Sequence, residues 1–168
     1  MLSKLNLEVL KKAKQKGAFS KKVILAIDLT FIPYYGKMTR WINGGKPKKG
    51  TSYFHVWATL RVVSAGRRFT IKAIPIKRGC LDASSMAKTV KELLSEAKSL
   101  NLHVELVLLD KGFCWREVIR QLKDSGVTFL VAAKKDKEVK AAILDYFKTG
   151  KDPVRPWSKG KGKGEGYF

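Results

Sequence analysis

The hydrophobic pattern of the first half of the chain predicts three strands. A continuous apolar run at 23–29 is typical of a strand that lies inside a sheet and is covered on both faces. Two further apolar runs at 53–63 and 67–76, separated by the small residues 64–66, predict a hairpin. Because Pro75 has no backbone N–H to donate, we expect the third strand at the edge of the sheet.

The second half of the chain predicts helices that alternate with strands. Asp82 and Ser84 or Ser85 are good caps for a helix that ends near 99–101. One apolar stripe runs along this helix and consists of Met86, Val90, Leu93, Leu94 and Ala97. The elements after it are a strand at 104–109 that ends on Asp110, a helix that ends just before Gly126, a strand at 128–132 and a helix at 137–147. The last helix is expected to turn inward Val139, Ile143, Tyr146 and Phe147.

This order of elements predicts an α/β fold. Three antiparallel strands followed by two crossover units make a mixed five-stranded sheet flanked by helices, in the order strand-strand-strand-helix-strand-helix-strand-helix. The first strand is expected near the centre of the sheet, with the fourth strand beside it and parallel to it. Asp28 and Asp110 then lie on neighbouring strands, at the end of the sheet where such folds bind ligands.

The chain is expected to have three segments. Residues 1–22 form a basic amphipathic lead-in whose apolar face consists of Leu2, Leu5, Val9 and Leu10. We interpret this helix either as a solvated helix packed on the edge of the domain or as a helix that contacts DNA. Residues 23–149 form the core, and the Gly- and Lys-rich tail at 150–168 is not expected to form regular structure.

Composition points to a polyanionic partner. The 168 residues include 35 Lys plus Arg and 14 Asp plus Glu, and the resulting net charge of +21 exceeds what solubility requires. No apolar run is long enough to span a membrane and the amino terminus lacks a secretory signal, so we expect a cytoplasmic protein associated with the nucleoid. Cys80 and Cys114 lie far apart, which argues against a zinc site and a disulfide framework.

Asp28 is the anomaly of the first predicted strand. Burial of an unpaired carboxylate is unfavourable by several kcal/mol, so we expect Asp28 to be paired, protonated or bound to a metal. Asp110 beside it adds a second negative charge, which a hard divalent cation such as Mg²⁺ or Mn²⁺ neutralises. Two such metals activate an attacking hydroxyl and stabilise the leaving oxygen of a phosphodiester. In the alternative interpretation, Asp28 pairs with a lysine and Asp110 only caps a turn.

The residues around both carboxylates resemble a known family. The segments Asp28–Gly36 (DLTFIPYYG) and Leu109–Phe113 (LDKGF) are similar to the first and second acidic motifs of the DDE transposases of prokaryotic insertion sequences. Residues 113–122 and 129–135 are similar to the helix and the fifth strand that follow the second motif. The resemblance covers about residues 23–135 and implies a ribonuclease H-like fold.

The resemblance also implies a reaction, a cofactor and a partner. Members of the family cut transposon DNA ends to free 3′ hydroxyls and join these to target DNA, with Mg²⁺ held in a two-metal site by two Asp and one Glu. Asp28 and Asp110 match the two aspartates directly, both as catalytic residues and as metal ligands. Transposon ends and target DNA are the implied partners, with a homodimer on the DNA as a candidate assembly.

The third acidic ligand of the family has no match in this sequence. In similar enzymes it lies on a helix beyond an inserted segment, and this chain ends where that segment would begin, so the sequence predicts a truncated catalytic core. Asp145 and Glu138 share one face of the last predicted helix and are the candidates within the chain. Ordinary solvated charges on an amphipathic helix are the simpler interpretation of both.

Basic residues interleaved with aromatic ones surround the predicted site. This pattern suits phosphate contact and base stacking, although a solvated loop between the first two strands explains the basic run at 37–49 equally well. The candidate DNA-binding residues are Lys37, Arg40, Trp41, Lys46, Lys48, Lys49, Lys111 and Arg116.

Three functions are consistent with these observations. The first is a catalytic-domain fragment of a DDE transposase. The second is a non-catalytic nucleic-acid-binding module in which the carboxylates are relics. The third is a small metal-dependent nuclease in which Asp145 or Glu138 supplies the third ligand.

Overall fold

The computed structural model describes residues 2–64, 68–133 and 137–150 and divides the chain into two units, Met1–Ala132 and Ala133–Phe168. The helices of the first unit are α1 (Leu2–Gln15), α2 (Ala83–Ser99) and α3 (Arg116–Asp124), with a short 3-10 turn η1 (Lys111–Phe113). Its strands are β1 (Val23–Pro33), β2 (Ile42–Lys48), β3 (Thr51–Val62), β4 (Phe69–Pro75), β5 (Val104–Leu109) and β6 (Phe129–Val131). The second unit contains α4 (Lys137–Thr149). Most of the turn predicted at 64–66, and the predicted tail from 151 onward, lie outside the described residues.

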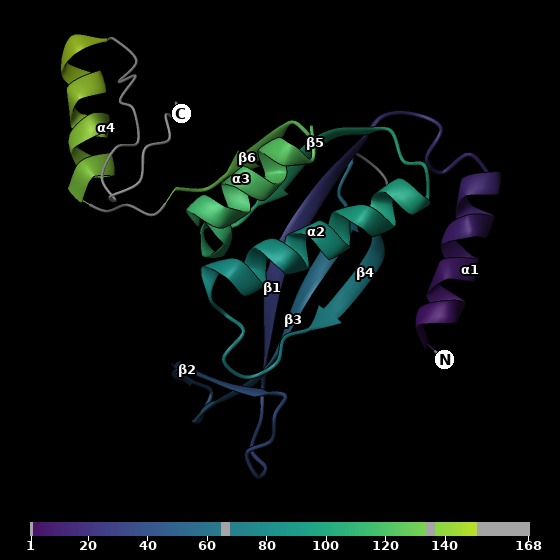
Figure 1. Ribbon diagram of the computed structural model, residues 1–168, viewed down its shortest axis with the longest axis horizontal. Coiled ribbons are helices and arrows are strands. Elements are labelled where there is room, and N and C mark those ends of the chain that lie inside the picture. The colour runs from purple at the N-terminus through teal and green to yellow at the C-terminus, as the bar shows by residue number, and fades with distance from the viewer. Residues whose placement is uncertain (1, 65–67, 134–136, 151–168) are drawn as a thin grey trace. The chain divides into compact units, whose positions relative to one another are not determined.

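Six strands form one mixed sheet in the first unit (Figure 1). Their order is β2-β3-β1-β5-β6, and β4 pairs with β3. Strand β1 runs antiparallel to β3 and parallel to β5, which is in turn parallel to β6. The predicted mixed sheet, with its first strand in the middle and the strand 104–109 parallel beside it, is therefore confirmed. So is the edge position of the strand that ends at Pro75, since β4 pairs only with β3 among the described strands.

The sixth strand, β2, corrects the prediction of five strands. The sequence suggests a loop at 36–50, whereas β2 pairs with the first half of β3. Ile42 is 0% exposed and lies opposite His55, so a buried apolar residue anchors this strand. Lys49 and Gly50 adopt positive φ values of 53° and 77°, as a tight hairpin turn requires. Strand β2 contains two glycines and a proline, which are uncommon in strands, so strand propensity does not predict it.

Helix α2 has the predicted buried face, and its cap is Asp82, one of the three predicted candidates. The Oδ1 atom of Asp82 accepts a hydrogen bond from the backbone N–H of Ser85 at 3.0 Å. The hydrogen bonds from Ser85 hold the pKa of the Asp82 carboxyl below its ordinary value. The buried residues of the helix are those of the predicted stripe, namely Met86, Val90, Leu93, Leu94 and Ala97. They join the core cluster that also contains the inner faces of β1, β3 and β5.

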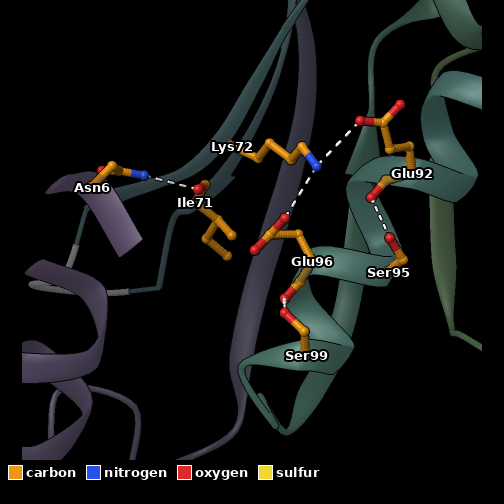
Figure 2. Close-up of polar contacts among 7 residues, drawn as sticks. All are labelled: Asn6, Ile71, Lys72, Glu92, Ser95, Glu96 and Ser99. Carbon is orange, nitrogen blue, oxygen red and sulfur yellow. Dashed lines mark hydrogen bonds and ion pairs between the residues drawn. The ribbon is translucent and has the colours of Figure 1, made fainter. Parts of the chain in front are cut away.

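Helix α1 packs with a different face from the predicted one. Leu10 is buried, but Leu5 and Val9 are 50% and 57% exposed. The side-chain amide of Asn6 donates to the carbonyl oxygen of Ile71 on β4 at 2.9 Å (Figure 2). A polar residue that caps an edge-strand carbonyl thus shifts the contact face away from the purely apolar stripe. This contact fits the interpretation of a helix packed on the edge of the domain.

Lys72 of β4 links the sheet to α2 through two carboxylates (Figure 2). Its Nζ atom lies 3.2 Å from Oε1 of Glu92 and 3.1 Å from Oε2 of Glu96. Burial lowers the pKa of Lys72, but hydrogen bonds and charge attraction from both glutamates act in the opposite direction, and the net result is a raised pKa. The raised pKa means that this contact stabilises the fold fully below the ordinary lysine value of 10.5, and that its contribution is lost as pH rises through the higher folded-state pKa.

Replacement of Glu96 by Gln is expected to lower the free energy of unfolding at neutral pH by about 0.5–1 kcal/mol, because one partner of a half-exposed ion pair is lost. Urea denaturation measures the difference. Glu105→Gln removes the same charge from an exposed position of β5 and is the matched control. Equal stability of the Glu96 and Glu105 variants would contradict a stabilising role for this contact.

The second unit contains the predicted last helix as α4. The amide N–H of Gly150, at φ 64°, donates to the carbonyl oxygen of Tyr146 and closes the helix. Ile143, Tyr146 and Phe147 are 39%, 44% and 77% exposed, and their predicted inward orientation stays a prediction because the described part of this unit has no second element against which this face packs. The side chain of Val139 lies outside the description. Among the described helices of the chain, none is long and apolar enough to cross a membrane.

Candidate functional site

Asp28 lies in the middle of β1 with an exposed side chain, so the predicted buried carboxylate is wrong. Leu25 and Ile27 on one face of β1 are buried at 0% and 1% exposure. Ile24 and Ala26, on the other face with Asp28, are only partly buried. Because side chains alternate along a strand, the apolar run fills the core with one face only and leaves Asp28 accessible to a ligand.

Asp110 follows β5 directly and is also exposed. Its backbone is fixed by the turn that follows, because the N–H of Phe113 donates to the carbonyl oxygen of Asp110 at 2.9 Å. Phe113 is 0% exposed and anchors this turn in the core. The indole Nε1 of Trp115 donates to the carbonyl oxygen of Gly112 at 3.0 Å and closes the other side of the turn. Asp110 is therefore an exposed carboxylate on a fixed backbone.

The register of β1 and β5 brings the two carboxylates together, as the sequence predicts. Ile27 lies opposite Leu109 in this parallel pair, and one residue further along each chain stand Asp28 and Asp110. Residues at matching positions of parallel strands point to the same face, and neighbouring strands lie about 4.8 Å apart. The two acidic groups thus share one face of the sheet, opposite to that of the buried Ile27 and Leu109.

This pair has the donor set of a divalent-cation site. Ionised carboxylates offer only acceptor oxygens, which are the ligands that Mg²⁺ and Mn²⁺ prefer. Gly112 lies beside both segments of the pair: a Cβ atom there would lie 4.0 Å from Oδ2 of Asp110 and 3.6 Å from Cδ1 of Leu29. Within the described residues no group of three His, Cys, Asp or Glu side chains converges, so no third side chain of these types joins the pair there.

The basic residues predicted to bind DNA lie on several elements. Lys111 is exposed in η1 beside Asp110, and Arg116 begins α3 with a partly buried side chain. The other candidates lie between the end of β1 and the turn that joins β2 to β3. They are Lys37, Arg40, Trp41, Lys46, Lys48 and Lys49, and all five cations among them are exposed. The site residues that sequence reasoning missed are Lys77 and Arg78, which follow β4 and lie against Arg40 and Trp41. Their only signal in the sequence is a basic pair between a proline and a glycine.

The two candidates for the third acidic ligand belong to the second unit. Both Glu138 and Asp145 lie on α4, and Asp145 is exposed. The side chain of Glu138 lies outside the described residues.

A family comparison gives the class of the domain. Residues 19–166 match the model of the transposase DDE domain. The chain belongs to this family. A search of curated proteins finds no match. The cryo-EM structure of the piggyBac transposase synaptic complex with hairpin DNA is similar, with a TM-score of 0.52, 17% identity, and coverage of 80% of this chain and 27% of that chain. The catalytic domain of the Mos1 mariner transposase aligns with a TM-score of 0.44, 14% identity, and coverage of 88% and 68% of the two chains.

The family match establishes a DDE transposase domain, and its fold is ribonuclease H-like, as the sequence predicts. The chain spans about a quarter of the length of the piggyBac chain, at 27%. Members of this family generally use divalent metal ions.

Proposed function

We propose that this DDE domain acts on DNA in transposition, with Asp28 and Asp110 as the residues that hold its divalent metal ions. The observation that supports the proposal is the register of β1 and β5, which sets the two carboxylates side by side on one exposed face. Asp28 is the first residue, and Asp110 the second residue, of the two segments that resemble the acidic motifs of the family. Mg²⁺ or Mn²⁺ is the proposed cofactor.

The proposed reaction is cleavage of transposon DNA ends and joining of the freed 3′ hydroxyls to target DNA. A bound pair of divalent cations supplies Lewis acidity for the attacking and leaving oxygens of the phosphodiester. Asp28 and Asp110 supply negatively charged oxygens from two backbone segments that the sheet holds in register. Lys111, exposed next to Asp110, is placed to neutralise a phosphate group at the same position.

DNA is the proposed partner, in the form of transposon ends and target. The net charge of +21 favours the binding of a polyanion such as DNA. The exposed cations of the hairpin, with Lys111 and Arg116, are the proposed contacts. The piggyBac structure is itself a complex with hairpin DNA. A homodimer on the DNA and a location with the chromosomal DNA of the cell belong to the same proposal.

Nicking of supercoiled plasmid DNA tests this proposal. We expect that any nicking by this chain requires Mg²⁺ or Mn²⁺ and falls by at least about 100-fold in Asp28→Asn and in Asp110→Asn, because each change removes a charged metal ligand. Asp124→Asn makes the same change on the exposed end of α3 and is expected to retain activity. Nicking that needs no metal, or that survives both changes, would contradict the assignment.

The third ligand is tested with the same assay. Loss of nicking in Asp145→Asn or Glu138→Gln, with metal binding retained, identifies that residue as the missing acid. If the chain binds metal at the two aspartates without nicking, the third acid is one that the tested chain does not supply.

A further inference from the structure

A group of cations gathers where two strands meet end to end along one edge of β3. Strand β2 pairs with the first half of β3, where Ile42 lies opposite His55. Strand β4 pairs with the second half and ends at Pro75, opposite Trp57. The segments that flank this junction carry three cations, and two of them, Arg40 and Lys77, lie over the indole ring of Trp41. We call this group the junction cluster; it consists of Arg40, Trp41, Lys77 and Arg78.

The backbone beneath the junction cluster is firmly held. The N–H of Arg78 donates to the carbonyl oxygen of Arg40 at 2.9 Å, which ties the segment after β4 to the segment before β2. Asn43, which is only 3% exposed, donates its side-chain amide to the carbonyl oxygen of Ile76 at 2.9 Å. A buried polar side chain that bridges two strand ends restricts both segments. The cations above it are therefore attached to a rigid base.

Trp41 holds two of these cations. The Cζ atom of Arg40 lies 5.2 Å from the centroid of the indole ring, and the Nζ atom of Lys77 lies 5.7 Å from it. Both distances are within the range of cation–π attraction, which is strongest for tryptophan. The ring thus positions cations, which differs from the predicted use of this aromatic residue as a stacking platform for bases.

The junction cluster carries positive charge that no carboxylate in the described part of the chain pairs with. The side chains of Arg40, Lys77 and Arg78 are all exposed. Among the residues that the structure describes, none of the three forms an ion pair, since those pairs involve Lys72 alone. Three like charges held close together repel one another, and a polyanion removes that repulsion. A rigid cation cluster of this kind suits phosphate groups spaced along a backbone.

We propose that the junction cluster is a metal-independent binding site for the phosphate backbone of DNA, separate from the carboxylate pair. The strand register fixes its position: Asp28 is four residues before Ile32 on β1, and Ile32, His55 and Ile42 lie opposite one another across three strands. Strand geometry places the cluster roughly 15 Å from the carboxylates, or about four to five base-pair rises. It would contact the flank of the DNA rather than the scissile phosphate. The choice of DNA as ligand rests on the proposed function.

The experiment measures binding of the full chain to a short DNA duplex in EDTA by fluorescence anisotropy, between about 50 and 200 mM salt. The test variant is the double change Lys77→Ala with Arg78→Ala. The control is Lys88→Ala with Lys91→Ala, which removes the same charge from exposed positions of α2. We expect the test variant to bind about 10-fold or more weakly at 0.1 M salt, and the slope of log K against log salt to fall in magnitude by about 1.8, or 0.9 for each phosphate contact.

Trp41→Leu separates the two roles of the indole ring. It keeps every charge, so loss of affinity together with a reduced salt slope supports the positioning of Arg40 and Lys77. Loss of affinity with an unchanged slope indicates base stacking and contradicts that role. Thermal unfolding of each variant confirms that the compared proteins are folded.

Three results overturn the site. One is an equal loss of affinity in the two double variants, another is an unchanged salt slope in the test variant, and the third is binding of DNA only when metal is present. Titration of the wild type and of Asp28→Asn with Mn²⁺ alone, without DNA, keeps the fate of this proposal separate from that of the metal site. Weakened binding in the cluster variant together with unchanged metal affinity in Asp28→Asn would support the cluster and contradict the metal site.

Discussion

Asp28→Asn and Asp110→Asn are each expected to weaken Mn²⁺ binding by at least about 100-fold, which exceeds the usual loss from changing a residue that only supports a ligand. Asparagine has nearly the same shape but carries no negative charge and has one oxygen in place of two. The two carboxylates act on the same ion, because β1 and β5 hold them in register. Loss of either one therefore removes most of the attraction for the cation.

Folding should not suffer from these changes. Both aspartates are exposed. Removal of one of two neighbouring like charges is neutral or slightly stabilising in the metal-free protein. Calorimetric titration with Mn²⁺ measures the affinity, and Asp124→Asn, which is expected to bind metal as the wild type does, controls for net charge. Unchanged Mn²⁺ affinity in either site variant would mean that the ion binds elsewhere.

Phe113→Ala is expected to lower the free energy of unfolding by about 3–5 kcal/mol, the usual range for a fully buried phenylalanine. Phe113 is 0% exposed and belongs to the core cluster. It also ends the turn that holds Asp110, through the hydrogen bond from its N–H to the carbonyl oxygen of Asp110. The ring therefore connects the stability of the core with the position of a site residue.

Urea denaturation measures this effect. Leu130→Ala, at a position of β6 that is 63% exposed, is the control and is expected to change the free energy of unfolding by less than about 1 kcal/mol. Phe113→Leu keeps most of the apolar volume and is expected to fall between the two, so that the site remains measurable in a folded protein. Similar stabilities for Phe113→Ala and Leu130→Ala would show that Phe113 is not a core anchor.

The sequence predicts the parts of this fold that depend on periodic apolar burial. The buried stripe on α2 follows directly from helical spacing, because five apolar residues on one face of a helix are buried most favourably against the core. The neighbouring positions of Asp28 and Asp110 follow from connectivity, since parallel strands joined by helices bring their carboxyl ends together.

The missed features depend on single contacts that have no periodic signal. Strand β2 is anchored by Ile42 among glycines and lysines, so its composition resembles a loop. Helix α1 packs with a different face from the predicted one because the side chain of Asn6 donates a hydrogen bond to a carbonyl group of the edge strand β4. Asp28 is exposed because the apolar run fills the core with only one face of β1. Lys77 and Arg78 lie near Arg40 only because β2 and β4 pair with the same edge of β3. No local sequence pattern predicts this arrangement.

The most direct test of the metal site is nuclear magnetic resonance of the ¹⁵N-labelled chain during a titration with Mn²⁺. The paramagnetic ion broadens the amide signals closest to it. We expect the signals of Asp28, Asp110 and their neighbours Leu29 and Lys111 to broaden first in the wild type, and to remain sharp at the same Mn²⁺ concentration in Asp28→Asn and Asp110→Asn. Broadening that begins elsewhere in the chain, or that persists around these residues in both variants, would contradict a metal site formed by the two aspartates.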